Sequence, residues 1–354
     1  MKCYLLAMSL LLGLIACDGN RHGQDRQGVP ALSVNDFAGK QREWGELFDM
    51  QVLDLHSDSL EYIGHIKDVA GMGTSVYVLN DVMSSVAKFD GRTGLLEREI
   101  SRRGNGPSEY IQPVALSADS IRLYLLDMGG LSILAYDGDL EMVRKIRLGF
   151  PALDFVKVSG GFLCYNLAVS DTLRQIVHVD ESGRVKASFG PTKMKPERMY
   201  TGAKVFSTDQ KGAVFCVLPF DRTVYYWEEA FRELRPFVAF DFGQKNLPED
   251  ADAGQTDAAT QSDYAVTSEF FHFDSLLVNS FLYANKRYYG FAPDGGTICR
   301  AGMMVDSHGG KPFFPRWQMG NVLVASYSYD EADEVESKGK YGNVLLLFRL
   351  KEHE

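Results

Sequence analysis

A charged pair flanks a glycine-rich loop in the segment Arg103-Gly104-Asn105-Gly106-Pro107-Ser108-Glu109-Tyr110. A guanidinium and a carboxylate held close together by such a turn provide hydrogen-bond donors and acceptors for a polar ligand. Arg103 and Glu109 are therefore candidate ligand-binding residues. The alternative is geometric, because glycine and proline punctuate chains where a turn is needed. Glu109 would then pair within its own loop, and Tyr110 would pack between neighbouring sheets.

A second candidate is the aromatic and cationic cluster Phe313-Phe314-Pro315-Arg316-Trp317. Binding pockets are commonly walled by aromatic rings and contain a few polar groups that orient the ligand. Arg316 and Trp317 are therefore candidate ligand-binding residues for a sugar or a peptide. The chain holds 22 Phe, 17 Tyr and 3 Trp, so the alternative is that these rings pack in the core.

Cysteine chemistry is expected at the N-terminus. Lys2 precedes an uncharged, Leu-rich run over residues 4–16, which is shorter than the ~20 apolar residues of a membrane-spanning helix and typical of a secretory signal. The run ends in Leu14-Ile15-Ala16-Cys17, which resembles the bacterial lipobox, where the thiol takes a diacylglycerol and cleavage occurs just before it. We predict that residues 1–16 are a signal peptide and that Cys17 is lipidated. An ordinary signal peptide is the alternative.

The chain after the signal divides into a tether and one domain. Residues 17–44 begin polar, glycine-rich and aperiodic, so we predict a lipidated Cys followed by a flexible tether. The domain is expected over residues 45–352, with a polar insertion near 244–266. That insertion contains five acidic residues over 249–263 but lacks the EF-hand calcium pattern, which favours a solvated segment.

Several function classes lack support in the sequence. The seven His are scattered without a zinc-binding pattern, and there is no P-loop or G-x-S-x-G motif, so we expect no metal and no cofactor and assign no catalytic residue. A formal net charge of −10 makes nucleic acid a poor partner. Acidic pairs for glycoside hydrolysis need only spatial proximity, and 47 Asp and Glu make some pair inevitable.

A repeat of ~40–50 residues underlies most of the chain. Each copy has an apolar strand that ends near Asn or Asp, a second strand that often ends in Asp-Gly, and a third strand rich in Val, Ile, Lys and Arg. The first strands of the six copies start at residues 76, 123, 162, 214, 280 and 322. One more short apolar segment precedes each copy. Short alternating runs with Asp-Gly hairpin signals indicate strands, so the unit is a four-stranded blade.

The sequence therefore predicts an all-β, six-bladed β-propeller with four-stranded blades. The sixth copy ends after its third strand, near Leu350, whereas residues 50–55 form a strand without a neighbour of their own. We predict that this N-terminal strand pairs in the last blade and closes the ring, which also covers an exposed sheet edge. A pair of β-sandwiches with coincidental spacing is the alternative fold.

Three cysteines remain in the predicted domain: Cys164, Cys216 and Cys299. An odd number permits at most one disulfide among them. Cys164 and Cys216 occupy equivalent positions of consecutive copies, where strands splay apart beyond the ~7 Å between Cα atoms that a disulfide tolerates. We expect no disulfide between these two, and three buried, reduced thiols.

Three segments carry a resemblance to a known family. Residues 103–110 are similar to a Gly-x-Gly-Pro-Gly-Glu-Tyr signature, with Ser108 in place of a Gly; residues 53–66 and 242–248 resemble two further segments. The chain thus resembles the six-bladed β-propeller lipoproteins of Bacteroides-type bacteria, which are distantly similar to NHL-repeat propellers. The resemblance spans roughly residues 45–350. It implies the fold firmly and the function poorly, because one fold hosts many functions.

The sequence favours a membrane-anchored lipoprotein of the cell envelope, on the periplasmic or outer surface of a membrane. It would act as a binding module for a glycan, a peptide or an envelope protein, and would contact the membrane through the lipid at Cys17. The alternative is a glycan hydrolase or lyase on the same scaffold, with residues converging at the mouth of the axial channel. A binding module is favoured over an enzyme.

The lipidation hypothesis has a direct test. Replacing Cys17 with Ala removes the thiol that would take the diacylglycerol, so we expect no metabolic labelling by a radioactive fatty acid and release or mis-processing of the protein. Labelling and membrane fractionation of Cys17→Ala and wild type measure both effects. A mutant that still labels and sediments with membranes contradicts the assignment.

Overall fold

Short strands follow one another through almost all of the computed structural model, which describes residues 28–34, 36–57, 65–190, 204–248, 263–308, 311–328 and 343–351. The helices in these residues are single 3-10 turns, η1 (Trp44–Glu46) and η3 (Gly243–Lys245). In the described part of the chain, no helix is long and apolar enough to cross a membrane. Cys17 and residues 249–262 of the predicted insertion lie outside the described residues.

Three antiparallel sheets come first along the chain, each with its strands in sequence order. Blade 1 consists of β4 (Ile66–Met72), β5 (Ser75–Asn80), β6 (Ser85–Asp90) and β7 (Leu96–Ile100). Blade 2 consists of β8 (Pro113–Ala118), β9 (Leu123–Asp127), β10 (Ser132–Tyr136) and β11 (Met142–Arg147). Blade 3 consists of β12 (Ala152–Val158), β13 (Gly161–Asn166), β14 (Ile176–Asp180) and β15 (Val185–Phe189).

The other three sheets follow the same plan, and each includes one strand from the N-terminal region: a fifth strand in blades 4 and 5, and the fourth strand itself in blade 6. Blade 4 consists of β16 (Phe206–Thr208), β17 (Val214–Val217), β18 (Thr223–Glu228) and β19 (Glu233–Asp241). Blade 5 consists of β20 (Val266–His272), β21 (Leu276–Tyr283), β22 (Lys286–Pro293) and β23 (Arg300–Met304). Blade 6 consists of β26 (Trp317–Met319), β27 (Val322–Ser328), β28 (Asn343–Leu350) and β3 (Phe48–Asp54). Two strands of two residues each, β24 (Ser307–His308) and β25 (Lys311–Pro312), pair antiparallel between blades 5 and 6 of the sequence.

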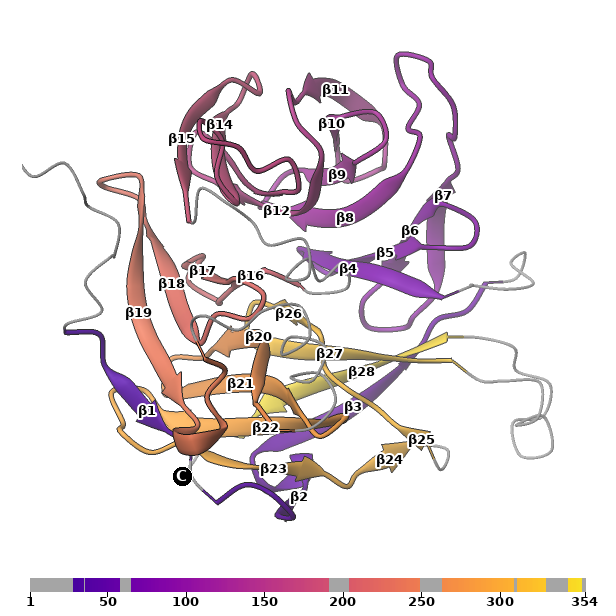
Figure 1. Cartoon of the computed structure of the whole chain (residues 1–354). Coiled ribbons are helices and arrows are strands. Elements are labelled where there is room, and N and C mark those ends of the chain that lie inside the picture. The colour runs from indigo at the N-terminus through magenta and orange to yellow at the C-terminus, as the bar shows by residue number, and fades with distance from the viewer. Residues whose placement is uncertain are drawn as a thin grey trace, which may run out of the picture.

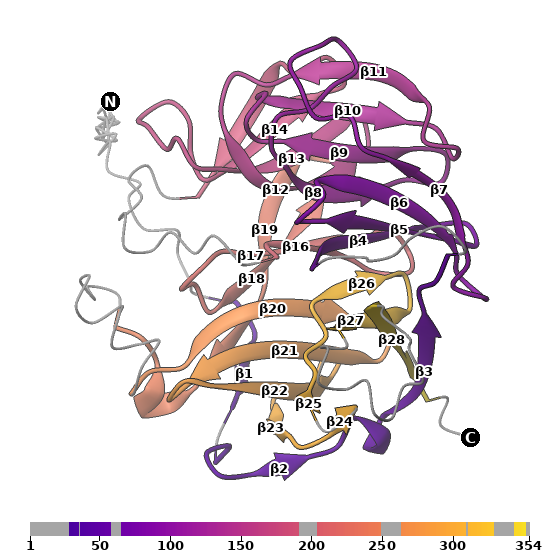
Figure 2. The same ribbon diagram turned by 90° about the vertical axis from the view of Figure 1, so that its right-hand side faces the viewer.

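The six blades form a β-propeller, as the sequence predicted (Figure 1 and Figure 2). Middle strands such as β9 and β13 are buried at every position because neighbouring blades cover both faces of each sheet. The outer strand β7 instead alternates between half-buried and exposed side chains along most of its length. Hydrophobic clusters fill the spaces between consecutive blades, so the core is a ring of interfaces around the axis.

The N-terminal strand closes the ring. β3 pairs antiparallel with β28 over seven residues, from Val344 opposite Asp54 to Leu350 opposite Phe48. β3 thereby supplies the outer strand that the last repeat lacks, which confirms the predicted closure. The ladder replaces two exposed sheet edges with one paired edge.

The three cysteines lie in different interfaces between blades, as the positions of Cys164 and Cys216 in consecutive repeats predicted. Cys164 packs between blades 2 and 3, Cys216 between blades 3 and 4, and Cys299 between blades 4 and 5. All three are free and buried. Burial raises the pKa of each thiol, for Cys299 to about 12, which makes them poor nucleophiles.

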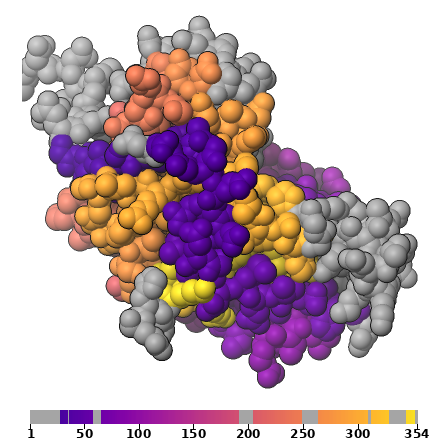
Figure 3. All heavy atoms as spheres, turned by 90° about the horizontal axis from the view of Figure 1, so that it is seen from below, coloured from indigo at the N-terminus to yellow at the C-terminus, as the bar shows by residue number. Residues whose placement is uncertain are grey.

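The prediction of a flexible tether through residue 44 is wrong from Ala31 onward. β1 (Ala31–Ser33) adds to blade 4 by parallel pairing with β19, and β2 (Gln41–Arg42) adds to blade 5 by parallel pairing with β23. We call residues 31–47 the strap. Figure 3 shows the N-terminal residues, in indigo, as a band across the orange blades.

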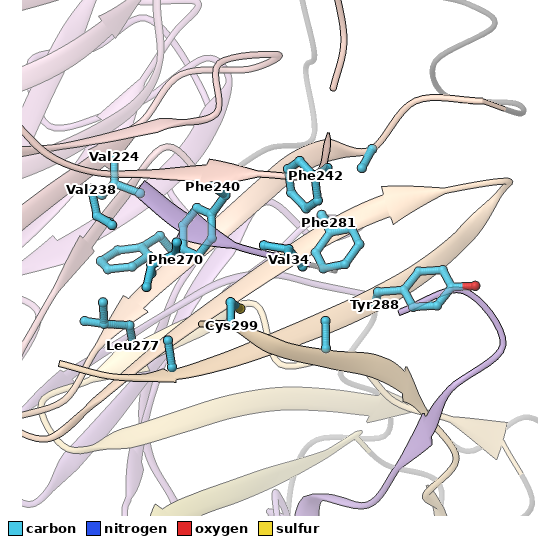
Figure 4. Packing of buried hydrophobic residues seen from close by; sticks show 14 of the residues in the cluster. Val34, Val224, Val238, Phe240, Phe242, Phe270, Leu277, Phe281, Tyr288 and Cys299 are labelled. Atoms are coloured by element: carbon cyan, nitrogen blue, oxygen red, sulfur yellow. The ribbon is translucent and has the colours of Figure 1, made fainter. Parts of the chain in front are cut away.

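Four buried apolar side chains hold the strap in place: Leu32, Val34, Phe37 and Trp44. The first three belong to the cluster that also contains Phe242, Phe281 and Tyr288, and Figure 4 shows Val34 among these rings. Phe37 meets Phe281 edge-on at 4.9 Å between ring centroids. The polar residues between these anchors obscure the pattern in the sequence.

The strap predicts a sharp boundary for truncation. A chain starting at residue 36 lacks Leu32 and Val34, and burying each of these side chains contributes roughly 1.5–3 kcal/mol. We expect the free energy of unfolding of 36–354 to be about 3–5 kcal/mol below that of 28–354. Urea unfolding measures both, with the full mature chain as control. Equal free energies of unfolding would show that this part of the strap does not stabilise the propeller.

Candidate functional site

The six inner strands enclose a cavity at the propeller axis. Its volume is about 150 Å³, and every blade contributes to its wall. Each inner strand contributes at least one lining residue. Examples, in the order of β4, β8, β12, β16, β20 and β26, are Ala70, Ser117, Phe155, Thr208, Phe271 and Trp317. We call this space the axial cavity. Propellers place the inner strands of all blades around one channel, so residues far apart in sequence meet there.

A buried ion-pair cluster lies at the wall of the axial cavity. The Nζ atom of Lys204 lies 2.8 Å from Oδ2 of Asp68 and 3.0 Å from Oδ1 of Asp154. Both carboxylate residues are 2% exposed, and Lys204 lines the cavity. We call these three residues the axial triad. It joins β4 and β12 to the segment just before β16, and so connects blades 1, 3 and 4.

A bulge lies near the start of β4, beside Asp68, and another near the start of β12, beside Asp154. The register of β4 shifts between Ile66 and Asp68, and that of β12 shifts between Ala152 and Asp154. A bulge leaves a residue unpaired and redirects side chains locally. The Asp68 carboxylate accepts hydrogen bonds from the amides of Val69 (2.9 Å) and Leu116 (2.7 Å), the second of which belongs to the next blade.

Asp154 makes the corresponding contacts two interfaces further on, between blades 3 and 4. Its Oδ2 accepts hydrogen bonds from the amides of Val205, at 2.8 Å, and Phe206, at 3.1 Å, in blade 4. Between these two positions, Oγ of Ser117 accepts a hydrogen bond from the amide of Lys157, at 3.0 Å. Side chains of the inner strands thus bridge three consecutive blade interfaces around the axis.

Burial and pairing act against each other in the axial triad. Burial raises the pKa of Asp154, and the nearby Lys204 ammonium offsets part of that rise. Burial alone would lower the pKa of Lys204, but Asp154 and Asp68 raise it above its ordinary value. Lys204 is therefore a charged ammonium that neutralises one of two buried carboxylates.

The structure brings two of the four predicted ligand-binding residues to the cavity. Arg316 and Trp317 both line it, at the start of β26. The guanidinium carbon of Arg316 lies 5.7 Å from the centre of the Trp317 ring, within cation–π range. Trp317 is 3% exposed, so its ring is chiefly part of the wall between blades 6 and 1.

Arg103 and Glu109 do not line the axial cavity. Glu109 accepts a hydrogen bond from the amide of Gly106, at 2.7 Å, and a Cβ on Gly104 would collide with its carboxylate. Tyr110 is fully buried and donates a hydrogen bond to the carbonyl of Ser84, at 2.7 Å. These contacts correspond to the geometric alternative, in which the loop shapes the passage from blade 1 to blade 2.

One histidine–carboxylate pair lies near the cavity. Nδ1 of His272 is 2.9 Å from Oδ2 of Asp209, across the interface of blades 4 and 5. The imidazole packs against Phe215, with 4.7 Å between ring centroids, and His272 does not line the cavity. The pair therefore ties two blades together. No group of three or more potential metal ligands occurs in the residues that the structure describes.

A family model covers the propeller. Residues 57–353 match the family described as Domain of unknown function (DUF4934). The chain belongs to the DUF4934 family. A comparison of this DUF4934 chain with curated proteins found no match.

Two solved structures show the same fold as the DUF4934 chain. One is a protein described as exported from Bacteroides fragilis: it has a TM-score of 0.70 and 16% identity, and the match covers 91% of this chain and 100% of that one. The other is a member of the DUF4221 family from Bacteroides vulgatus, with a TM-score of 0.56 and 11% identity. This match covers 86% of this chain and 97% of that one. At such identities the likeness concerns the fold alone.

The axial triad of this DUF4934 protein was missed from the sequence. Asp68 and Asp154 each interrupt an apolar segment, at equivalent positions of blades 1 and 3. An acidic residue inside a predicted inner strand is the signal that marks them, because a buried carboxylate needs a partner. Lys204 lies outside the strands and carries no comparable signal.

Removing the triad's cation has a pH-dependent consequence. In Lys204→Met, two buried carboxylates lose their counter-ion, so we expect a loss of about 3–5 kcal/mol in the free energy of unfolding at neutral pH. Without the Lys204 ammonium, burial raises the pKa of the Asp154 carboxyl further above its unfolded value, and stability falls as pH rises through that pKa. The loss relative to wild type should therefore be smaller at pH 5 than at pH 7.5.

Urea unfolding at the two pH values measures this difference. Lys186→Met is the matched control, because Lys186 is exposed on β15. A Lys204→Met variant with the same deficit at both pH values would show that the carboxylates do not depend on Lys204.

Proposed function

We propose that this protein is a lipid-anchored envelope propeller that binds a ligand in the axial cavity without transforming it. The observation that carries the proposal is the cavity itself, whose wall receives residues from all six inner strands. Concave, partly apolar cavities with a few polar groups are the usual form of a small-ligand site.

The hydrogen bonds of the axial carboxylates support binding over catalysis. A glycoside hydrolase uses one carboxyl group as an acid and a second as a base or nucleophile. Asp68 is occupied by two amides and Lys204, and Asp154 by two amides and Lys204. Neither carboxylate is left free to transfer a proton or attack a sugar. The hypothesis of a hydrolase or lyase therefore loses the two carboxylates at the axis as catalytic candidates.

The envelope location is supported by the N-terminal sequence. The apolar run of residues 4–16 and the following Cys17 fit a lipoprotein signal. The fold is shared with a protein that is described as exported. Contacts with the propeller begin at Pro30, whose carbonyl accepts a hydrogen bond from the amide of Ala239, so ~12 residues separate this contact from Cys17, enough for roughly 40 Å if extended.

The binding proposal is tested by filling the cavity. Ala118 lines it, and Ala118→Trp places a large ring in the space. Purified 28–354 is screened on glycan and peptide arrays, with binding and turnover both recorded. We expect the affinity for any specific ligand to fall at least tenfold in Ala118→Trp.

Two control variants define the outcome. Ala230→Trp adds the same ring at an exposed site, and Arg103→Ala alters a residue outside the cavity, so both should bind as wild type does. Binding that survives Ala118→Trp in a folded protein places the site elsewhere. Turnover that Ala118→Trp abolishes would show an enzyme instead of a binding module.

A further inference from the structure

We propose that the axial cavity takes one neutral, hydroxyl-bearing six-membered ring, that is, a single sugar residue. This inference rests on the proposed function, since it names the ligand class of the same site. Size, charge, hydrogen-bonding capacity and the apolar wall all bear on it.

The size of the cavity selects a single ring. A space of about 150 Å³ matches a cavity that holds one benzene molecule. A pyranose has a ring of the same number of atoms, and its hydroxyl groups add volume, so they extend toward the open side of the cavity. A disaccharide or an extended peptide does not fit within that volume, although either could place one terminal unit inside and continue out of the mouth.

The charges at the wall disfavour an ionic ligand. Lys204 and Arg316 are the charged lining residues, and Asp68 and Asp154 lie behind Lys204, so these four formal charges sum to zero and an anion meets no net counter-charge. A cation would approach the Lys204 ammonium, which is the member of the triad that lines the cavity. Moving a charged group out of water also carries a large desolvation penalty. A neutral ligand avoids all three costs.

Polar groups of both kinds remain available around the cavity. Lys204 has three N–H donors and uses two on Asp68 and Asp154, which leaves one. The hydroxyls of Ser207 and Thr208, two further lining residues, form no side-chain hydrogen bond within the described residues.

Hydroxyl groups satisfy such a mixed set. A hydroxyl donates one hydrogen bond and accepts others, so one ligand hydroxyl suits Lys204 and others suit the hydroxyls of Ser207 and Thr208. A purely apolar ring would leave the third N–H of Lys204 without an acceptor, which carries a penalty at a partly buried site. A carboxylate or phosphate would supply acceptors only.

The remaining wall is apolar and firmly held. Phe155, Phe206 and Phe271 line the cavity from three different inner strands, and each is at most 3% exposed. Their strands are paired in ladders on one side, so the wall is preformed. A sugar ring presents C–H groups on its faces and hydroxyls at its edge, which matches apolar walls with polar groups between them.

The experiment uses purified 28–354 and three groups of probes. Glucose, galactose and N-acetylglucosamine are the neutral sugars; glucosamine and galacturonate are the charged analogues; an array of short peptides is the alternative class. Ligand-observed NMR with competition gives the affinities. Oligosaccharides that end in the tightest-binding sugar are tested as well. If the natural ligand is the end of a glycan chain, such an oligosaccharide should bind more tightly than the monosaccharide alone.

Two variants locate the binding. Thr208→Val keeps the shape of the side chain and removes one lining hydroxyl, so we expect a two- to tenfold weaker affinity for the sugar. Thr74→Val makes the same change at an exposed hairpin residue and should bind as wild type does. Ala118→Trp should abolish sugar binding.

The outcomes separate this inference from the proposed function. Neutral sugars that bind more tightly than both charged analogues, with losses in Thr208→Val and Ala118→Trp, support it. Peptides or charged compounds that bind in an Ala118→Trp-sensitive way, while neutral sugars do not, overturn the sugar inference and leave the binding function standing. If no probe shows cavity-dependent binding, both fail and the cavity holds only water.

Discussion

Ring closure is the constraint on which the rest of this structure depends. A six-bladed ring has one seam, and here the seam is a seven-residue antiparallel ladder between β3 and β28. Without it, two sheet edges would be exposed and blade 6 would lack its outer strand. The closure also fixes the spacing of the inner strands, because each blade packs mainly against its two neighbours and the hydrophobic clusters lie between consecutive blades. The axial cavity exists because six blades complete the circle.

The axial triad illustrates what buried charge does in such a ring. Pairing buried ions seldom gives more stability than apolar packing of the same volume, whereas leaving one unpaired is costly. The Asp68 and Asp154 carboxylates nevertheless reach amides of the neighbouring blades. Their contacts depend on blade order and register, so the triad favours one arrangement of otherwise similar blades. In doing so it also places an ammonium at the cavity wall.

The repeat made most of the fold predictable from the sequence. Alternating strands, Asp-Gly turns and the strand missing from the last copy are local signals, and together they indicate the propeller and its closure. The strap was missed because β1 and β2 have only three and two residues and their apolar anchors are too widely spaced to form a periodic pattern. Strands this short are stabilised by the blade edges that receive them.

The site was harder to predict than the fold. Lys204 and Asp68 are 136 positions apart, and only the ring geometry brings them together. Arg316 and Trp317 were found because aromatic and cationic residues cluster within one segment. The loop with Arg103 and Glu109 drew attention because of its glycines, yet those glycines make room for the Glu109 carboxylate within the loop itself. A conspicuous motif therefore marked a tight turn, while the charged groups at the axis had only a weak local signature.

The seam between β3 and β28 also sets the order of events during synthesis. β3 leaves the ribosome about 290 residues before the strand that it pairs with, and at 5–20 residues per second that interval is roughly 15–60 s. For all of that time β3 lacks its partner strand, whereas the partners of β1 and β2 are made earlier. A secreted chain would spend this interval beside the translocation channel, where holding chaperones act. Biogenesis of this propeller should therefore depend on such protection far more than the stability of the finished ring would imply.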